Sequence, residues 1–191
     1  MPPTTTTSDP RTTAMVLFLD LQEEIVKNSR THPVATISGH ARALAKLAAL
    51  HGLPAFASSV PPGGPFLAEV LEPLSQVEPR PRTQTTAFAD PGLVDAIAAT
   101  GRSLLVLAGV ASEIVVQRTA LDALSAGYSV QIAVDACGGV SARTEDAAWS
   151  RIVQAGGVLT SVTTFGAELA GDFTTELGGA TLGVVYETLG G

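Results

Sequence analysis

Short apolar runs alternate with segments of helical spacing along the chain. Apolar runs bounded by glycine, proline or polar residues are typical of strands buried on both faces of a sheet, and they lie at residues 14–20, 54–60, 103–109, 128–136 and 158–162. Apolar residues spaced three or four apart predict helices at residues 36–51, 66–74, 91–100, 112–126 and 144–155. This alternation predicts an α/β fold with three layers, α/β/α, around a mostly parallel central sheet of Rossmann-like strand order.

The ends of the chain and one internal segment differ from this pattern. Residues 1–13 are rich in Thr, Pro and Ser, which predicts a flexible N-terminal arm before a single domain at residues 14–191. Residues 78–86 are polar and rich in proline, and we expect them to be an irregular connection. A chain of 191 residues is long enough for one α/β domain with a full core.

Composition narrows the classes of partner. Hydrophobic residues make up 46% of the chain and charged residues only 15%, so we expect part of the surface to be covered by copies of the same chain, as a homo-oligomer. The net charge is −7 and no basic run occurs, which disfavours binding to nucleic acid or to anionic membranes.

The number of cysteines and the hydropathy of the chain indicate the cellular compartment in which we expect the protein. A single cysteine excludes an internal disulfide framework. No apolar run reaches the roughly 20 residues of a membrane span, and the first residues lack the apolar core of a secretory signal. We therefore expect a cytoplasmic protein that is not bound to a membrane.

Ligands of such folds bind beyond the carboxyl ends of the strands, so the residues there are the first candidates for a site. Asp20 ends a fully apolar strand, where a carboxylate can do acid–base work but can equally serve as a helix cap or loop acceptor. The turn from Gly109 to Ser112 joins a buried strand to a helix, and such a turn can bind an oxyanion, although every βα turn looks similar. Ser58, Ser59 and residues 135–139 follow other strands.

Other reactive side chains carry weaker signals. Cys137 has no histidine near it in sequence, so a buried structural thiol is the better interpretation. His32, His40 and His51 lack metal-ligand spacing and are interpreted as surface or helix-end residues. No dinucleotide-binding glycine motif follows the first strand and no P-loop is present, so we expect no cofactor.

Four segments in this order carry a family resemblance: VLFLDLQEEIV, RTQTTAFADPGLVDAI, TGRSLLVLAGVASEIVVQRTALDALSAGYSVQIAVDACGG and AAWSRIVQAGGVLTS. Together they resemble the isochorismatase-like (cysteine hydrolase) superfamily, and within it the small bacterial hydrolases of uncertain substrate. The resemblance covers residues 15–170 and implies a parallel α/β sheet with a catalytic triad of Asp, a basic residue and Cys.

The resemblance assigns roles to individual residues. Asp20 and Gln22 match the family's DxQ motif, and the basic residue matches Arg82, or Arg80 if the alignment slips. The Val110–Ala111 bond corresponds to a non-proline cis peptide that shapes an oxyanion site with Ser112. No metal-binding Asp/His cluster corresponds to that of the family's nicotinamidases, so we expect no metal.

The decisive departure from the family pattern is Val115. The motif G-V-x-T-E-x-C reads GVASEIV here, so valine occupies the nucleophile position and covalent catalysis from it is impossible. The isochorismatases themselves act without this Cys, by protonating an enol ether with the Asp and adding water.

Three hypotheses about function follow. The first is a hydrolase of a small amide, ester or enol ether that uses Asp20 as general acid or base and Arg82 to stabilise charge or hold a substrate carboxylate. The second is an inactive family member that binds a small molecule or a partner. The third is a purely structural oligomer with a filled pocket. A cavity that touches Asp20, Arg82 and Val115 would discriminate among them.

Overall fold

The protein is described by a computed structural model, in which residues 9–189 are placed well enough to describe. One six-stranded sheet has the order β3-β2-β1-β4-β5-β6, and each pair of neighbouring strands is parallel. The strands are β1 Ala14–Leu19, β2 Ala55–Ser59, β3 Arg80–Pro81, β4 Leu104–Val110, β5 Ser129–Gly138 and β6 Val158–Thr160. The predicted parallel α/β fold is confirmed.

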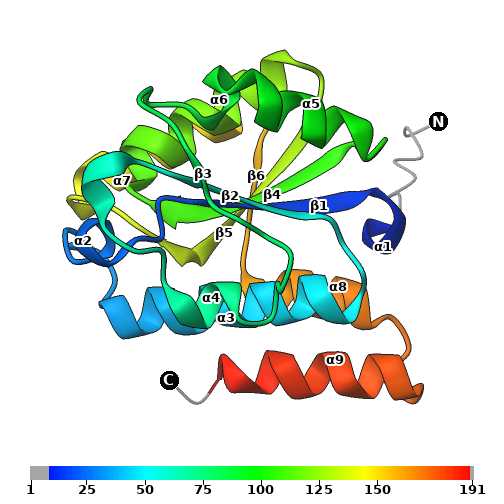
Figure 1. Cartoon of the computed structure of the whole chain (residues 1–191). Coiled ribbons are helices and arrows are strands. Elements are labelled where there is room, and N and C mark those ends of the chain that lie inside the picture. Colours follow the sequence, from blue (N-terminus) through cyan, green and yellow to red (C-terminus); the bar gives the residue numbers. More distant parts are fainter. Residues whose placement is uncertain (1–8, 190–191) are drawn as a thin grey trace.

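Helices cover both faces of the sheet and complete three layers (Figure 1). One face carries α5 Pro91–Ala99, α6 Gln117–Ser125 and α7 Ala142–Gln154. The other carries α3 Val34–Leu50, α4 Ala68–Leu71 and α8 Val162–Ala170, and α9 Glu176–Glu187 packs outside α3 and α8. The short helices α1 Pro10–Thr13 and α2 Glu23–Val26 lie at opposite ends of β1.

Strand β1 shows why its sequence is apolar without alternation. Every residue from Ala14 to Leu19 is buried. Val16 and Phe18 pack into the core beneath α3 and α8, whereas Leu17 and Leu19 pack into the core beneath α5 and α6. Because both faces of a parallel sheet are covered, neither set of side chains meets water.

Three elements differ from the sequence prediction. The connection expected at residues 78–86 contains β3, which pairs only with Ser58 and Ser59. The helix expected at residues 112–126 begins as a π-helical turn, Ser112–Val116, and continues as α6. Strand β5 extends through Gly138, so Cys137 lies inside a strand rather than after one.

The N-terminal arm expected at residues 1–13 is only partly described. Residues 1–8 lie outside the described residues. Residues Pro10–Thr13 form the helical turn α1, which the Asp9 side chain caps by accepting a hydrogen bond from the amide of Arg11 at 2.9 Å. In the described part of the chain, no helix combines the length and the apolar character needed to cross a membrane.

The carboxyl ends of β1 and β4 approach closely at Gly109. A Cβ atom added to Gly109 would lie 2.2 Å from the carbonyl oxygen of Leu19. Neither backbone can yield easily, because both belong to the central strands of the sheet. Glycine at this position therefore sets the spacing between the turns that follow the two strands.

We expect Gly109→Ala to lower the free energy of unfolding by about 1–3 kcal/mol, the usual cost of overpacking a core. The matched control is Gly39→Ala in α3, where an added Cβ has no atom within 4 Å and φ is negative, so the variant should be neutral or slightly stabilised. Urea denaturation measures both. A Gly109→Ala midpoint equal to that of the unmodified protein would contradict the close approach.

Candidate functional site

Asp20 is the first residue after β1, at the carboxyl edge of the sheet. Its backbone is left-handed, with φ of 53°, a conformation that Asp and Asn tolerate better than most side chains. The Asp20 amide donates to the carbonyl of Ser58 at 2.9 Å, and the Gln22 amide donates to the carbonyl of Asp20 at 2.7 Å. The chain thus leaves β1 in a tight, hydrogen-bonded turn.

The Asp20 carboxylate pairs with the guanidinium of Arg82. Nη1 donates to Oδ1 at 2.5 Å and Nη2 donates to Oδ2 at 2.7 Å, while Nη1 also lies 3.0 Å from the Ser58 hydroxyl. The side chains of Arg82 and Asp20 are only 2% and 8% exposed. The amide of Arg82 donates to the carbonyl of Ser59 at 2.9 Å, which places the residue beside the end of β2.

Burial and pairing act on the Asp20 carboxyl in opposite directions. Burial raises the pKa of Asp20 above its ordinary value, and the hydrogen bonds and positive charge of Arg82 offset part of this rise. The Nε atom of Arg82 is buried with no hydrogen-bond partner in the described structure. The pair therefore holds a carboxyl group whose proton affinity is raised by its surroundings.

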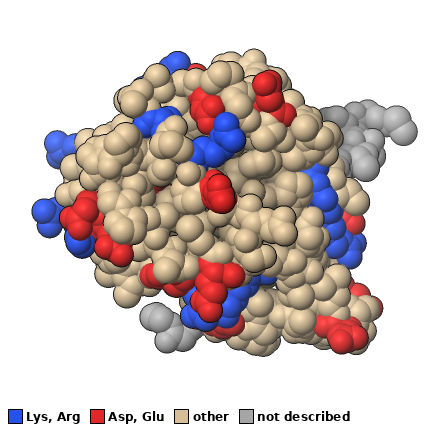
Figure 2. Space-filling view, viewed as in Figure 1, with Lys and Arg blue, Asp and Glu red and all other residues tan. Residues whose placement is uncertain are grey.

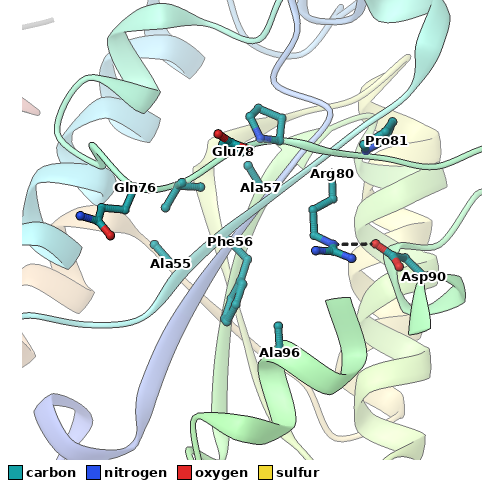
Figure 3. Close-up of a pocket in the computed structure, with 11 residues that line it drawn as sticks. Ala55, Phe56, Ala57, Gln76, Glu78, Arg80, Pro81, Asp90 and Ala96 are labelled. Carbon is teal, nitrogen blue, oxygen red and sulfur yellow. Dashed lines mark hydrogen bonds and ion pairs between the residues drawn. The ribbon is translucent and has the colours of Figure 1, made fainter. Parts of the chain in front are cut away.

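Arg80, the alternative basic residue, lies elsewhere. It is exposed, and its Nε donates to Oδ2 of Asp90 at 2.8 Å. Figure 3 shows this pair at the rim of a hollow of about 640 Å³ beside β2, with Phe56 and Ala96 in its walls. That hollow is larger than the cavity at Asp20 but touches neither Asp20 nor Val115. Of the two arginines, Arg82 is the one that the fold brings to Asp20.

A smaller cavity of about 210 Å³ opens at Asp20. Val115 is buried and faces this cavity from the π-helical turn after β4. Arg82 lies behind Asp20 and does not line the cavity. The lining residues are Asp20, Ile25, Asn28, Val110, Ala111, Ile114, Val115 and Val140. The space is thus open rather than filled, and most of its wall is aliphatic.

The turn after β4 carries the expected cis peptide between Val110 and Ala111, and both residues line the cavity. Ser112 is brought to this turn but does not face the cavity. It is fully buried, and its hydroxyl donates to Oε1 of Glu145 on α7 at 2.6 Å. The Ser112 side chain therefore anchors the turn to α7.

Gln22 also holds structure rather than lining the cavity. Its side-chain nitrogen donates to the carbonyls of Val60 and Gly64 at 3.0 and 2.7 Å, and its side-chain oxygen accepts from the amide of Val60 at 2.8 Å. These bonds tie the loop after β2 to the turn that carries Asp20.

Four cavity residues carried no signal in the sequence: Ile25, Asn28, Ile114 and Val140. Ile114 and Val140 are 51% and 53% exposed and form an apolar rim. The carboxylate of Glu113 accepts from the Val140 amide at 2.9 Å and from the Thr144 hydroxyl at 2.6 Å, so it fixes the two sides of the rim together.

Cys137 is fully buried in β5, as the sequence predicted, and burial raises the pKa of its thiol. Its carbonyl oxygen lies 3.2 Å from Nδ1 of His32. His51 follows α3, and its Nε2 lies 2.8 Å from the Thr181 hydroxyl. Among the described residues, no three His, Cys, Asp or Glu side chains gather in a way that could hold a metal ion.

The chain is similar to known proteins in sequence and in fold. The chain is 30% identical over 171 residues to the Probable hydrolase YcaC of Escherichia coli K12, which spans 87% of this chain and 82% of that protein. The structure of YcaC from Pseudomonas aeruginosa with hexane-2,5-diol and covalent acrylamide superposes with a TM-score of 0.85 at 31% identity, over 91% of this chain and 89% of that one.

The E. coli YcaC structure, described as an octameric hydrolase of unknown specificity, superposes with a TM-score of 0.87 at 27% identity, over 93% of this chain and 88% of that one. The profile of the Isochorismatase domain matches residues 14–164, which include Asp20, Arg82 and Val115. Because this match spans most of the chain, the protein belongs to the isochorismatase family.

Proposed function

We propose that the protein is a hydrolase that acts on a small metabolite, an amide, ester or enol ether, without a cysteine nucleophile. Asp20 is the general acid or base, and Arg82 stabilises its charge. The observation that carries this proposal is a buried ion pair, Asp20–Arg82, whose Asp20 member lines a cavity beside the Val110–Ala111 peptide. The family relationship to a probable hydrolase supports the reaction class.

The protonation state of Asp20 selects between two routes. With an enol ether, protonated Asp20 transfers its proton to the vinyl carbon. Water adds to the resulting oxocarbenium carbon and gives one proton back to the Asp20 carboxylate, and the hemiketal then breaks down to the alcohol and a carbonyl compound. With an ester or amide, ionised Asp20 accepts a proton from the water that attacks the carbonyl and returns it to the leaving group. In both routes Arg82 compensates the carboxylate when it is ionised.

A second candidate function is supported by Val115. Valine cannot attack a carbonyl, so a site that once needed a thiol at this position could now only bind. In that case the protein is a small-molecule-binding member of the family. The two candidates differ in whether Asp20 contributes to turnover.

We expect Asp20→Asn to reduce kcat by roughly two to four orders of magnitude, the range for loss of a positioned acid–base group. An acid role predicts that kcat/KM falls as pH rises through the elevated Asp20 pKa, and a base role predicts a fall as pH drops below it. The measurement is a pH–rate profile on substrates from an amide, ester and enol-ether screen. Asp95→Asn, at an exposed position on α5, is the matched control.

In this test, a loss of activity caused by unfolding must be distinguished from a loss caused by removal of the acid–base group. Asp20→Asn leaves the Arg82 charge buried without a partner, which costs about 3–5 kcal/mol of unfolding free energy. The double variant Asp20→Asn/Arg82→Gln removes both charges and should regain much of this stability while remaining inactive. Turnover near the unmodified level in either variant removes Asp20 from the mechanism.

The nucleophile position is tested with Val115→Cys in a Cys137→Ala background. A thiol there would face the 210 Å³ cavity, so it should be alkylated by iodoacetamide or acrylamide near neutral pH. In the unmodified chain, Cys137 should react at least about tenfold more slowly, because it is fully buried and its pKa is raised. Mass spectrometry of the native proteins measures both rates. An unreactive thiol at position 115 would favour a closed site without activity.

We also propose that the chain self-associates, as a dimer or a larger assembly up to an octamer. Figure 2 shows charged side chains in separate groups with uncharged areas between them. At the opposite edge from β3 the sheet ends at β6, where Val158, Leu159 and the nearby Val153 of α7 are exposed. The octameric state of E. coli YcaC supports this proposal. Light scattering at micromolar concentration should give a mass well above 19.5 kDa, and a clean monomer would contradict it.

A further inference from the structure

The charges around the cavity at Asp20 point to the class of molecule that it accepts. Among the residues that line it, the only ionisable side chain is that of Asp20, and the only other polar side chain is that of Asn28. All six remaining lining side chains are aliphatic: Ile25, Val110, Ala111, Ile114, Val115 and Val140. No Lys, Arg or His is among the lining residues.

Arg82, the cation bonded to Asp20, has no terminal nitrogen free for a substrate carboxylate. Both terminal nitrogens of Arg82 are bonded to the two oxygens of Asp20, and the Arg82 side chain is only 2% exposed. To bind a substrate carboxylate, Arg82 would have to release Asp20, which would leave the Asp20 charge buried without a partner. The geometry therefore argues against the expectation that Arg82 holds a substrate carboxylate.

The nearest cations along the chain do not line the cavity. Lys27, next to Asn28 in sequence, is paired with Glu24 at 2.6 Å. The Arg30 amide donates to the carbonyl of Gly139 at 2.7 Å, but the Arg30 side chain is exposed and is not among the lining residues. At the rim, Glu113 adds a second acidic group, and its carboxylate is held there by the Val140 amide and the Thr144 hydroxyl.

Given the proposed function, on which this inference rests, we propose that the site takes small uncharged molecules with an apolar body and one carbonyl or ether group, and that it excludes carboxylates. The aliphatic wall removes the apolar body from water. The polar group of the ligand is directed to Asp20, Asn28 and the Val110–Ala111 peptide, the polar parts of the wall. A cavity of about 210 Å³ has room for a body of a few carbon atoms.

A matched pair of probes tests this inference without turnover. Isovaleramide and isovalerate have nearly the same shape and differ in charge at neutral pH. Ligand-observed NMR titration of the full chain should show isovaleramide binding at least about tenfold more tightly, because the acid would bring an unpaired charge into the cavity. If isovaleramide does not bind, or binds no better than isovalerate, the inference is overturned.

A charge placed in the wall tests the cause of the preference. Asn28 is exposed and lines the cavity, and its side-chain nitrogen donates to the carbonyl of Glu24 at 2.8 Å. Asn28→Lys should therefore add a cation there at the cost of one exposed hydrogen bond, with the fold kept. Isovalerate binding should then strengthen about tenfold relative to isovaleramide. Asn28→Gln is the neutral control and should keep the original preference. If Asn28→Lys leaves the ratio unchanged, the charge of the wall does not select the ligand and the inference fails.

The experiments distinguish failure of this inference from failure of the proposed function. Loss of the Asp20 role would appear as turnover that survives Asp20→Asn, while the binding ratio of amide to acid stays high. Failure of the substrate class would appear as tight acid binding, while turnover still depends on Asp20.

Discussion

The buried ion pair between Asp20 and Arg82 is the interaction on which the arrangement of the site depends. It joins the end of β1 to the segment after β3, and the Ser58 hydroxyl at the end of β2 contacts the same guanidinium nitrogen. Burying two charges costs desolvation free energy. The attraction between the charges and their hydrogen bonds offset this free energy only when the geometry is good. A short strand with few bonds of its own, β3, is thereby held at the edge of the sheet.

Much of the fold could be predicted from periodicity because the core strands obey it strictly. In β1 and β4 nearly every residue is buried, and the uninterrupted apolar runs follow directly from helices on both faces. Strand β3 could not be predicted in this way, since Arg80 and Pro81 are both exposed and two residues show no period. The π-helical turn at Ser112–Val116 has the same apolar spacing as the helix that follows it, so sequence cannot separate them.

The site was predicted in part, and the residues that differ show where sequence reasoning ends. The structure brings Asp20, Arg82 and the Val110–Ala111 turn together at one edge of the sheet, and their catalytic roles stay predictions. Gln22 and Ser112 are nearby, but their side chains bond to the loop after β2 and to Glu145. A motif gives the position of a residue on the chain, whereas the direction of its side chain depends on partners far away in sequence, here 42 and 33 residues away.

The left-handed backbone at Asp20 restricts which residue types can occupy this position, whatever their role in the site. At φ of 53°, side chains with a Cβ are disfavoured, and only Asn and Asp adopt the conformation at little cost. Glutamate would supply the same carboxyl group, but its backbone would be strained in the left-handed conformation. Alanine would be strained there as well and would also remove the charge. Geometry therefore limits the residues at the end of β1, and of Asn and Asp, which fit well, only aspartate carries a titrating carboxyl group. A family member without the acid here is expected to carry asparagine or glycine, which keep the turn, so this position shows whether a chain has a carboxyl group at the end of β1.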